Sequence, residues 1–200
     1  MQKKRVRKIR NKKNSLWKES IVYLKTTLTF IYIMIAVFFI SAFIAFSFSE
    51  QFSFFDELLR ELTSKIEGKN IFELIWFIFQ NNVSSAFVAM IFGIILGIMP
   101  IANALINGAL LGYVYSLASS EGGFRVIVYL LPHGIFELPA VFIALGLGLK
   151  WGMFIFAGKG KRKSEFLKRF FGSMKVFLTI VLPLLIIAAI IEGLLIVAGG

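Results

Sequence analysis

The sequence predicts an all-α protein, a bundle of helices that crosses a membrane several times. Hydrophobic residues make up 58% of the 200 residues, and 23 residues are phenylalanine. Ordinary soluble domains do not have this balance. Several stretches of about 20 residues carry few or no charges, which is the length a helix needs to cross about 30 Å of hydrocarbon. We expect one membrane domain over residues 26–200, after a basic cytoplasmic tail over residues 1–25.

The cysteine count and the net charge narrow the function classes. The chain has no cysteine, which excludes disulfides, thiol nucleophiles and metal sites with cysteine ligands. The formal net charge of +11 would suit a nucleic-acid partner, but the basic residues are distributed as in a membrane protein whose charges set its orientation. We therefore expect membrane lipids as partners, touched by the basic tail, and no nucleic acid.

A run of 35 residues without a charge, residues 83–117, is the most informative stretch. As one helix it would be about 53 Å long at roughly 1.5 Å per residue, which is too long for one span. Pro100, preceded by Gly97, lies near its middle. Two helices in a tight hairpin would explain the run, and so would one long kinked helix.

The charges favour the hairpin, which gives spans at about residues 26–48, 83–99, 101–118, 126–149 and 174–198. The tail and residues 150–175 then lie on one side and hold 18 of the 22 Lys and Arg residues. This asymmetry follows the positive-inside rule, whereas one long helix would place the basic segment "KGKRKSEFLKR" outside. We expect a multi-pass plasma-membrane protein with a cytoplasmic N-terminus, a basic cytoplasmic loop over residues 150–173 and an outer C-terminus.

Residues 50–80 form an outer segment of mixed character. Apolar residues recur in it at helical spacing, with charged residues on the rest of the wheel: Phe55, Leu58, Leu59, Leu62 and Ile66. This pattern predicts an amphipathic helix that lies at the membrane interface. Asn70 and Glu73 are spaced as a capping box. Residues 71–79 after it are expected to form another interfacial or shallowly inserted piece.

Small residues recur every fourth position in the second and third spans. They are Ser85, Ala89, Gly93 and Gly97 in one span, and Ala104, Gly108, Gly112 and Ser116 in the other. Such stripes let helix backbones approach closely. Packing inside one subunit is the first interpretation, and a homodimer interface is the alternative. Asn103 and Asn107, one turn apart, are expected to form hydrogen bonds between helices.

The fourth span contains a predicted helix break. Pro132 suits the first position of a helix, and Gly134 and Pro139 loosen the turns that follow. His133 is the only histidine, and Glu137 lies one helical turn later on the same face. Broken helices at membrane depth are tolerated where they are buried in protein or line a cavity.

Helix directions predict an outer-leaflet polar cluster of His133, Glu137, Glu192 and Asn82. Three roles are open for it. The groups would satisfy one another and the broken helix ends, or they would form an ion or proton site in a conduction pathway. Catalysis with a metal held by the histidine and the carboxylates is the third role. The chain has no HExxH pattern, and we expect no catalytic residue, no metal and no cofactor.

Four segments in this order resemble the stage II sporulation protein M family of integral membrane proteins: "NNVSSAFVAMIFGIILG", "NGALLG", "LPHGIFELPAVFIALGLGL" and "IIEG". The positions that match are Asn82, Gly93, Gly97, Asn107, Gly108, Gly112, Pro132, His133, Gly134, Glu137, Pro139 and Glu192. The resemblance implies a membrane anchor, which in spore-forming bacteria recruits secreted-side enzymes that degrade peptidoglycan. It also implies relatives in organisms that do not sporulate.

We therefore expect a non-catalytic membrane scaffold that recruits or organises other membrane or secreted-side proteins, with a homodimer as the favoured oligomer. The alternative is a channel or transporter for an ion or small solute, with His133, Glu137 and Glu192 along the path. An intramembrane metal-dependent hydrolase is the third hypothesis and fits the residues least.

Overall fold

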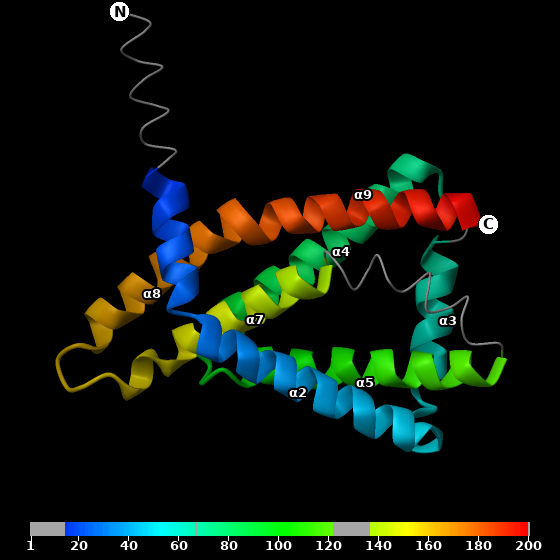
Figure 1. Cartoon of the computed structure of the whole chain (residues 1–200), viewed down its shortest axis with the longest axis horizontal. Helices are drawn as coiled ribbons and strands as arrows, with labels where there is room; N and C mark the ends of the chain where they lie inside the picture. The colour runs from blue at the N-terminus through cyan, green and yellow to red at the C-terminus, as the bar shows by residue number, and fades with distance from the viewer. Residues whose placement is uncertain (1–14, 67, 122–136, 200) are drawn as a thin grey trace, which may run out of the picture.

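The computed structural model describes residues 15–66, 68–121 and 137–199 (Figure 1). The secondary structure of these residues is helical, with no strand among them. Five helical stretches are long and apolar enough to cross a membrane: Leu28–Ser47, Ile71–Ile94, Ile98–Ser119, Leu138–Phe156 and Arg162–Val197. The predicted class, an all-α bundle with five spans, is confirmed.

The helices α2 (Leu28–Ser47) and α5 (Ile98–Glu121) pack along each other (Figure 1). Gly108 and Gly112 make this close approach possible, because a Cβ atom at either position would overlap the backbone carbonyl of Phe38 or Ala42. Ser41 Oγ donates a hydrogen bond to the Leu105 carbonyl at 2.7 Å across the same contact. The small-residue stripe of the third span is thus used inside one chain.

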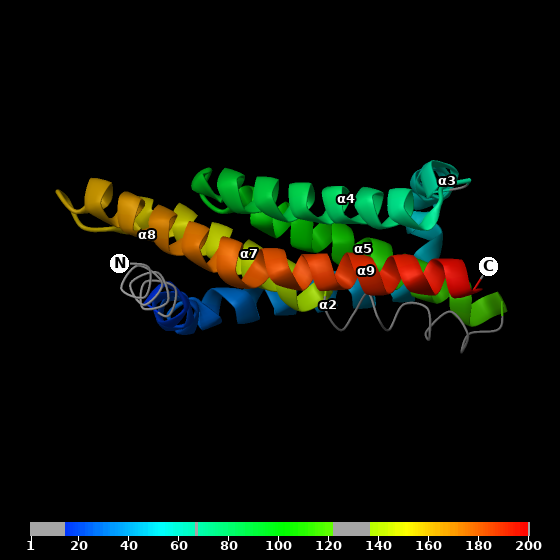
Figure 2. The ribbon, with the colours of Figure 1, turned by 90° about the horizontal axis from the view of Figure 1, so that it is seen from above.

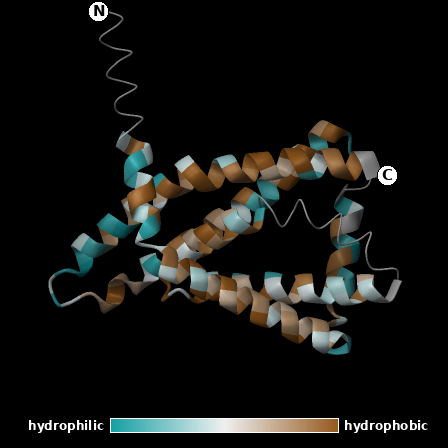
Figure 3. Cartoon of the chain, in the orientation of Figure 1, coloured by the Kyte–Doolittle hydropathy of each residue, from teal (hydrophilic) through white to brown (hydrophobic). Residues whose placement is uncertain are grey.

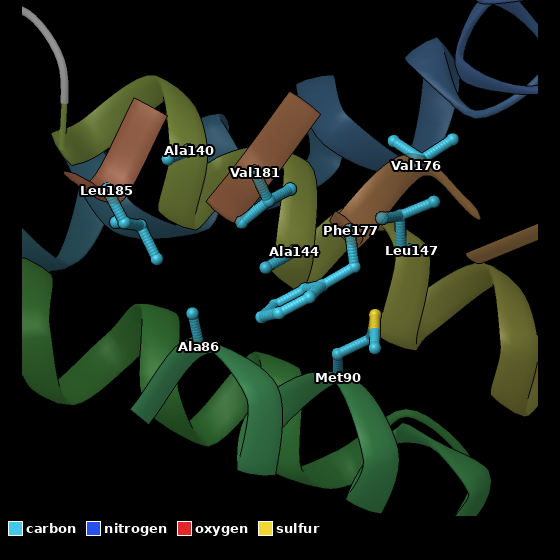
Figure 4. Close-up of a cluster of buried hydrophobic side chains, with 9 residues drawn as sticks. All are labelled: Ala86, Met90, Ala140, Ala144, Leu147, Val176, Phe177, Val181 and Leu185. Atoms are coloured by element: carbon cyan, nitrogen blue, oxygen red, sulfur yellow. The ribbon is translucent and has the colours of Figure 1, made fainter. Parts of the chain in front are cut away.

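The helix α7 (Leu138–Gly152) is the central helix of the bundle. It contacts α2, α4 (Ile71–Ile91), α5 and α8 (Arg162–Val176), and Figure 2 shows it between α4 and α2. Gly148 packs on the backbone of α4 at Met90, and Gly152 packs on Gly93 and Gly97. Figure 4 shows the neighbouring apolar core, where Ala86 and Met90 of α4 meet side chains of α7 and of the last span.

The second and third spans form the predicted hairpin, with the turn at residues 95–97. Leu96 has φ 54° and Gly97 has φ 73°, and the Gly97 N–H donates to the Gly93 carbonyl at 2.8 Å. Gly97 carries this left-handed backbone without a Cβ clash. Pro100 follows in the first turn of α5, where its missing N–H costs no helical hydrogen bond.

The second span begins earlier than the predicted residues 83–99. Residues 71–79, expected as a separate interfacial piece, are the first turns of α4. The Asn70 side chain accepts from the backbone N–H groups of Phe72 and Glu73, and Glu73 Oε2 accepts from the Asn70 N–H, so the capping box starts α4 here. The helix passes through Asn82 unbroken because this polar side chain finds a partner inside the bundle.

Residues 150–173, expected as a basic loop, are largely helical. The helix α8 begins at Arg162 and continues through a π-helical turn (Phe177–Val181) into α9 (Leu182–Gly199). The side chains of Glu165 and Arg169, one turn apart at 3.1 Å, support α8. The π turn comes just before Pro183, whose ring would collide with a carbonyl of the preceding turn in a regular α-helix.

Hydrophilic residues gather at both ends of the bundle, and mostly hydrophobic residues lie between them (Figure 3). The amphipathic helix α3 (Phe55–Ile66) runs across one end, nearly perpendicular to α5 (Figure 1). We call this the α3 end. The opposite end carries α8, the last turn of α7 and the helical residues 15–25, and we call it the basic end.

Candidate functional site

A buried hydrogen bond joins the middle of α4 to the start of α7. Asn82 Nδ2 donates to Glu137 Oε2 at 2.6 Å. The two residues are 9% and 7% exposed. Glu137 immediately precedes α7, and Pro139 occupies the first turn of that helix. A carboxyl group at this depth costs free energy unless a donor satisfies it, and the Asn82 amide is such a donor.

Asn82 and Glu137 lie on the wall of a cavity of about 270 Å³ between α2, α4, α5 and α7. Its polar lining residues are Asn81, Asn82, Ser85, Asn103, Asn107 and Glu137. Apolar residues complete the wall, among them Phe38 of α2 and Val141 of α7. Leu59 and Leu62 of α3 also line it, so the apolar side of α3 covers part of the cavity.

Hydrogen bonds order the polar wall. Asn81 Nδ2 donates to Asn82 Oδ1 at 3.3 Å, and Asn103 Nδ2 donates to Ser85 Oγ at 3.4 Å across the α4–α5 hairpin. Asn107 Nδ2 donates to the carbonyl of Asn103 at 2.9 Å, within its own helix. Asn103 therefore joins two helices as predicted, whereas the side-chain amide of Asn107 donates to a residue of α5 itself.

A family model described as Stage II sporulation protein M matches residues 26–195. The chain belongs to the stage II sporulation protein M family. No curated protein and no solved structure matches it. All the described residues that line the cavity lie inside the region that matches the stage II sporulation protein M family. Residues 15–25 lie outside that region.

The structure brings two of the four predicted cluster residues together, Asn82 and Glu137. His133 lies outside the described residues, as do Pro132 and Gly134 of the predicted helix break. Glu192 is not among the described residues that line the cavity. It lies on α9 next to Gly193, which packs on Ile75 of α4.

Asn82 lies in the middle of α4 rather than at the start of a helix, where the predicted bounds of the second span place it. Asn82 is about 17 Å along α4 from Ile71, at roughly 1.5 Å per residue. The first turn of α7 lies between the two ends of the bundle in Figure 1. The cause is the earlier start of α4, at Ile71, which moves the asparagines from the predicted start of a helix to its middle.

The sequence analysis does not assign several of the residues that line the cavity to a functional site. Ser85, Asn103 and Asn107 are predicted to pack helices, and Asn81 is absent from the predicted cluster. A usable signal is present, since Asn81 and Ser85 lie four apart on one helix, as do Asn103 and Asn107 on the next. No sequence pattern indicates that residues of α3 line the cavity.

The chemistry of the cavity follows from its groups. Amides and a hydroxyl offer both donors and acceptors, and Glu137 is the one ionisable side chain among the described lining residues. When ionised, a carboxylate in such a wall favours a cation or a donor-rich solute. Within residues 15–66, 68–121 and 137–199, no three His, Asp or Glu side chains gather as metal ligands would.

Proposed function

We propose that this chain is a non-catalytic membrane anchor that holds partner proteins at the outer face of a plasma membrane. The observation that carries the proposal is the attachment of α3 to the spans. Tyr113 Oη of α5 donates to Asp56 Oδ1 at 2.6 Å, and Phe55 packs with Ala45 and Ala109 in a buried cluster. An amphipathic helix held in this way presents a surface of fixed shape.

The remaining face of α3 offers contacts to a partner. Its exposed charged residues are Glu57, Arg60, Glu61 and Lys65, and Phe54 beside them is 64% exposed. Phenylalanine and arginine are enriched in protein interfaces, and the charged residues around them would suit the polar rim of such an interface. Charge distribution favours the outer side for this end, so the partners would be secreted-side proteins or outer parts of membrane proteins.

Site-specific photo-crosslinking in living cells tests the anchor role. A photoreactive amino acid is placed at Glu57 on α3, and as a control at Phe43 of α2, which is 70% exposed on an apolar helix. We expect one or a few discrete protein adducts from position 57 and lipid adducts from position 43. The same adducts from both positions, or no protein adduct from position 57, would contradict the anchor role.

The cavity supports a second candidate function, binding of a cation or a small polar solute for passage through the membrane. The supporting observation is a carboxyl group that faces a polar cavity in the middle of the bundle. Intramembrane acids of this kind often mark ion or proton paths.

Flux into proteoliposomes distinguishes this candidate from the anchor. The wild type is compared with Glu137→Gln and with Glu57→Gln, which removes the same charge from the surface of α3. A path through the cavity predicts flux of protons or of Na⁺ that Glu137→Gln abolishes and Glu57→Gln preserves. The anchor role predicts the same background leak in all three.

A further inference from the structure

A buried lysine lies at the basic end, outside the polar cavity described above. Lys150, in the last turn of α7, is 9% exposed. Its Nζ donates to Thr26 Oγ1 at 2.6 Å and to Thr27 Oγ1 at 3.1 Å, and it lies 3.8 Å from the centre of the Tyr23 ring. These are neutral groups, although a buried ammonium is usually stabilised by an opposite charge.

Neutral oxygens, rather than a carboxylate, surround the Lys150 ammonium. Among the described residues, no carboxylate oxygen lies within ion-pair distance of Lys150 Nζ. The Thr26 and Thr27 hydroxyls each donate to the Tyr23 carbonyl, so they accept from Lys150 through their lone pairs. They take two of the three N–H donors of the ammonium, the Tyr23 ring lies on a further side, and Lys150 also lines a cavity.

Lys150 lines a cavity of about 580 Å³ between residues 15–26, the end of α7 and α8. The lining residues are Ser15, Lys18, Glu19, Val22, Tyr23, Thr26, Lys150, Glu165, Lys168 and Arg169. Four of these are cations and two are carboxylates. The cavity is therefore positive, and Lys150 lies at its buried wall while Lys18 and Lys168 are exposed at the rim.

Both carboxylates of the cavity already have cation partners. Glu19 pairs with Lys175 at 2.6 Å, which adds a further cation at the border of the cavity. Glu165 pairs with Arg169 at 3.1 Å and with Lys168 at 3.6 Å. Arg169 also donates through Nη1 to the backbone carbonyl of Lys150, which joins α8 to the last turn of α7. An anion entering the cavity would meet excess positive charge.

The position of the cavity along the bundle, near the ends of the apolar helices, favours a lipid headgroup as the anion. The apolar helix α2 begins at Leu28, directly after Thr27, and α7 ends at Gly152, two residues after Lys150. The site thus lies where the apolar spans end, which is the level of lipid headgroups. Val22, 64% exposed on the wall, offers an apolar surface beside the charges.

We propose that this cavity binds the phosphate group of an anionic phospholipid from the leaflet at the basic end, with Lys150 donating to a phosphate oxygen at the buried wall. Lys18 and Lys168 add positive charge at the rim. By the distribution of basic residues we expect this leaflet to be the cytoplasmic one. The site is independent of the proposed role of α3 and of the polar cavity.

Native mass spectrometry of the detergent-solubilised full chain, titrated with phosphatidylglycerol, tests this site. Phosphatidylcholine, which is zwitterionic, serves as the comparison lipid. The wild type should retain phosphatidylglycerol in preference to phosphatidylcholine, and Lys150→Gln should lose the preference. Lys163→Gln removes an exposed charge of α8 that does not line the cavity, and it should retain the lipid as the wild type does.

A second pair of variants leaves the buried lysine in place, in case Lys150→Gln does not fold. Lys18→Gln with Lys168→Gln removes two rim charges and should weaken phosphatidylglycerol binding about tenfold or more, since a basic residue near an anionic lipid surface contributes roughly a factor of five. Lys159→Gln with Lys163→Gln removes two exposed charges elsewhere and should have little effect.

Three results would overturn the lipid site. Equal losses from the rim pair and the control pair would mean that net charge alone attracts the lipid. Displacement of the lipid by millimolar inorganic phosphate, with phosphate then bound at Lys150, would assign the site to free phosphate instead. Retention of phosphatidylglycerol by both the Lys150→Gln and the rim variants would exclude the site altogether.

Discussion

Among single residues, Asn82 and Glu137 illustrate how a polar pair is tolerated inside an apolar bundle. They are 55 positions apart in sequence, and neither residue would be stable at this depth without a hydrogen-bond partner. Their bond joins the hairpin that contains α4 to the central helix α7. The Glu137 carboxyl group of this pair also lines the polar cavity. The same residue therefore joins two helices and is the candidate binding group.

Replacing Asn82 by leucine should destabilise the protein by about 1–2 kcal/mol, because the Glu137 carboxyl loses a buried donor. Asn107→Ala is the matched control, since Asn107 lines the same cavity but donates within its own helix, and it should cost less than about 0.5 kcal/mol. Thermal unfolding in detergent measures both. Equal losses of stability in the two variants would show that the Asn82–Glu137 hydrogen bond does not stabilise the fold more than the Asn107 bond does.

At the basic end the exposed Glu19–Lys175 pair predicts a pH dependence of stability. The hydrogen bond from Lys175 holds the pKa of Glu19 below its ordinary value of 4.5. A carboxyl whose folded-state pKa is lowered stabilises the fold above its unfolded pKa, and this contribution is lost as the pH falls through the folded-state pKa.

Glu19→Gln should therefore lower the melting temperature slightly at pH 7, and its difference from the wild type should shrink as the pH falls to 3. Lys175→Gln should give the same pattern because it breaks the same pair. Differential scanning fluorimetry at the two pH values measures this. A deficit of equal size at pH 3 would mean that the substitution acts through something other than the ion pair.

Among the helices, the α2–α5 contact depends on glycines that leave no room for a side chain. Gly108→Ala should destabilise the protein by about 1–3 kcal/mol, since the added methyl group would overlap the Phe38 carbonyl. Gly158→Ala, where nothing lies within 4 Å of the added atom, is the control and should be near neutral. A neutral Gly108→Ala, measured by thermal unfolding, would contradict the close packing of α2 on α5.

The helices that the sequence predicts best are those with one strong signal. The first span, predicted at residues 26–48, is α2 at Leu28–Ser47, because an apolar run stands between polar segments there. The predicted start of the second span is wrong because Asn81 and Asn82 look like the end of a span when their buried partner is unknown. The helix α8 lies within the predicted basic loop and has no counterpart in the prediction, because dense positive charge suggests solvated chain.

The candidate site is predictable only in part for a related reason. Helix directions place Glu137 and Asn82 in one polar cluster, and the structure brings these two side chains together. The position of Asn82 along α4 and the presence of the α5 asparagines in the wall of the cavity depend on where α4 begins and how the hairpin turns at Gly97. Both features depend on tertiary packing, which cannot be predicted from a local sequence pattern.

In the whole molecule, the two proposed roles, partner binding and lipid binding, lie at opposite ends of the bundle. The α3 end presents an amphipathic helix held against the spans, and the basic end presents a positive cavity. The predicted homodimer would have to use a surface other than Gly108 and Gly112, because these residues face α2 within the chain. The anchor role requires that α3 lies outside the cell, and this orientation would place α8 and the lipid site at the cytoplasmic face.

Cysteine accessibility in intact cells tests this orientation most directly, since the chain has no cysteine of its own. Single substitutions Ser64→Cys on α3 and Ser164→Cys on α8 replace exposed residues at opposite ends. A membrane-impermeant maleimide should label position 64 in intact cells and position 164 only after the membrane is permeabilised. Labelling of position 164 but not position 64 in intact cells would reverse the topology and contradict the anchor role.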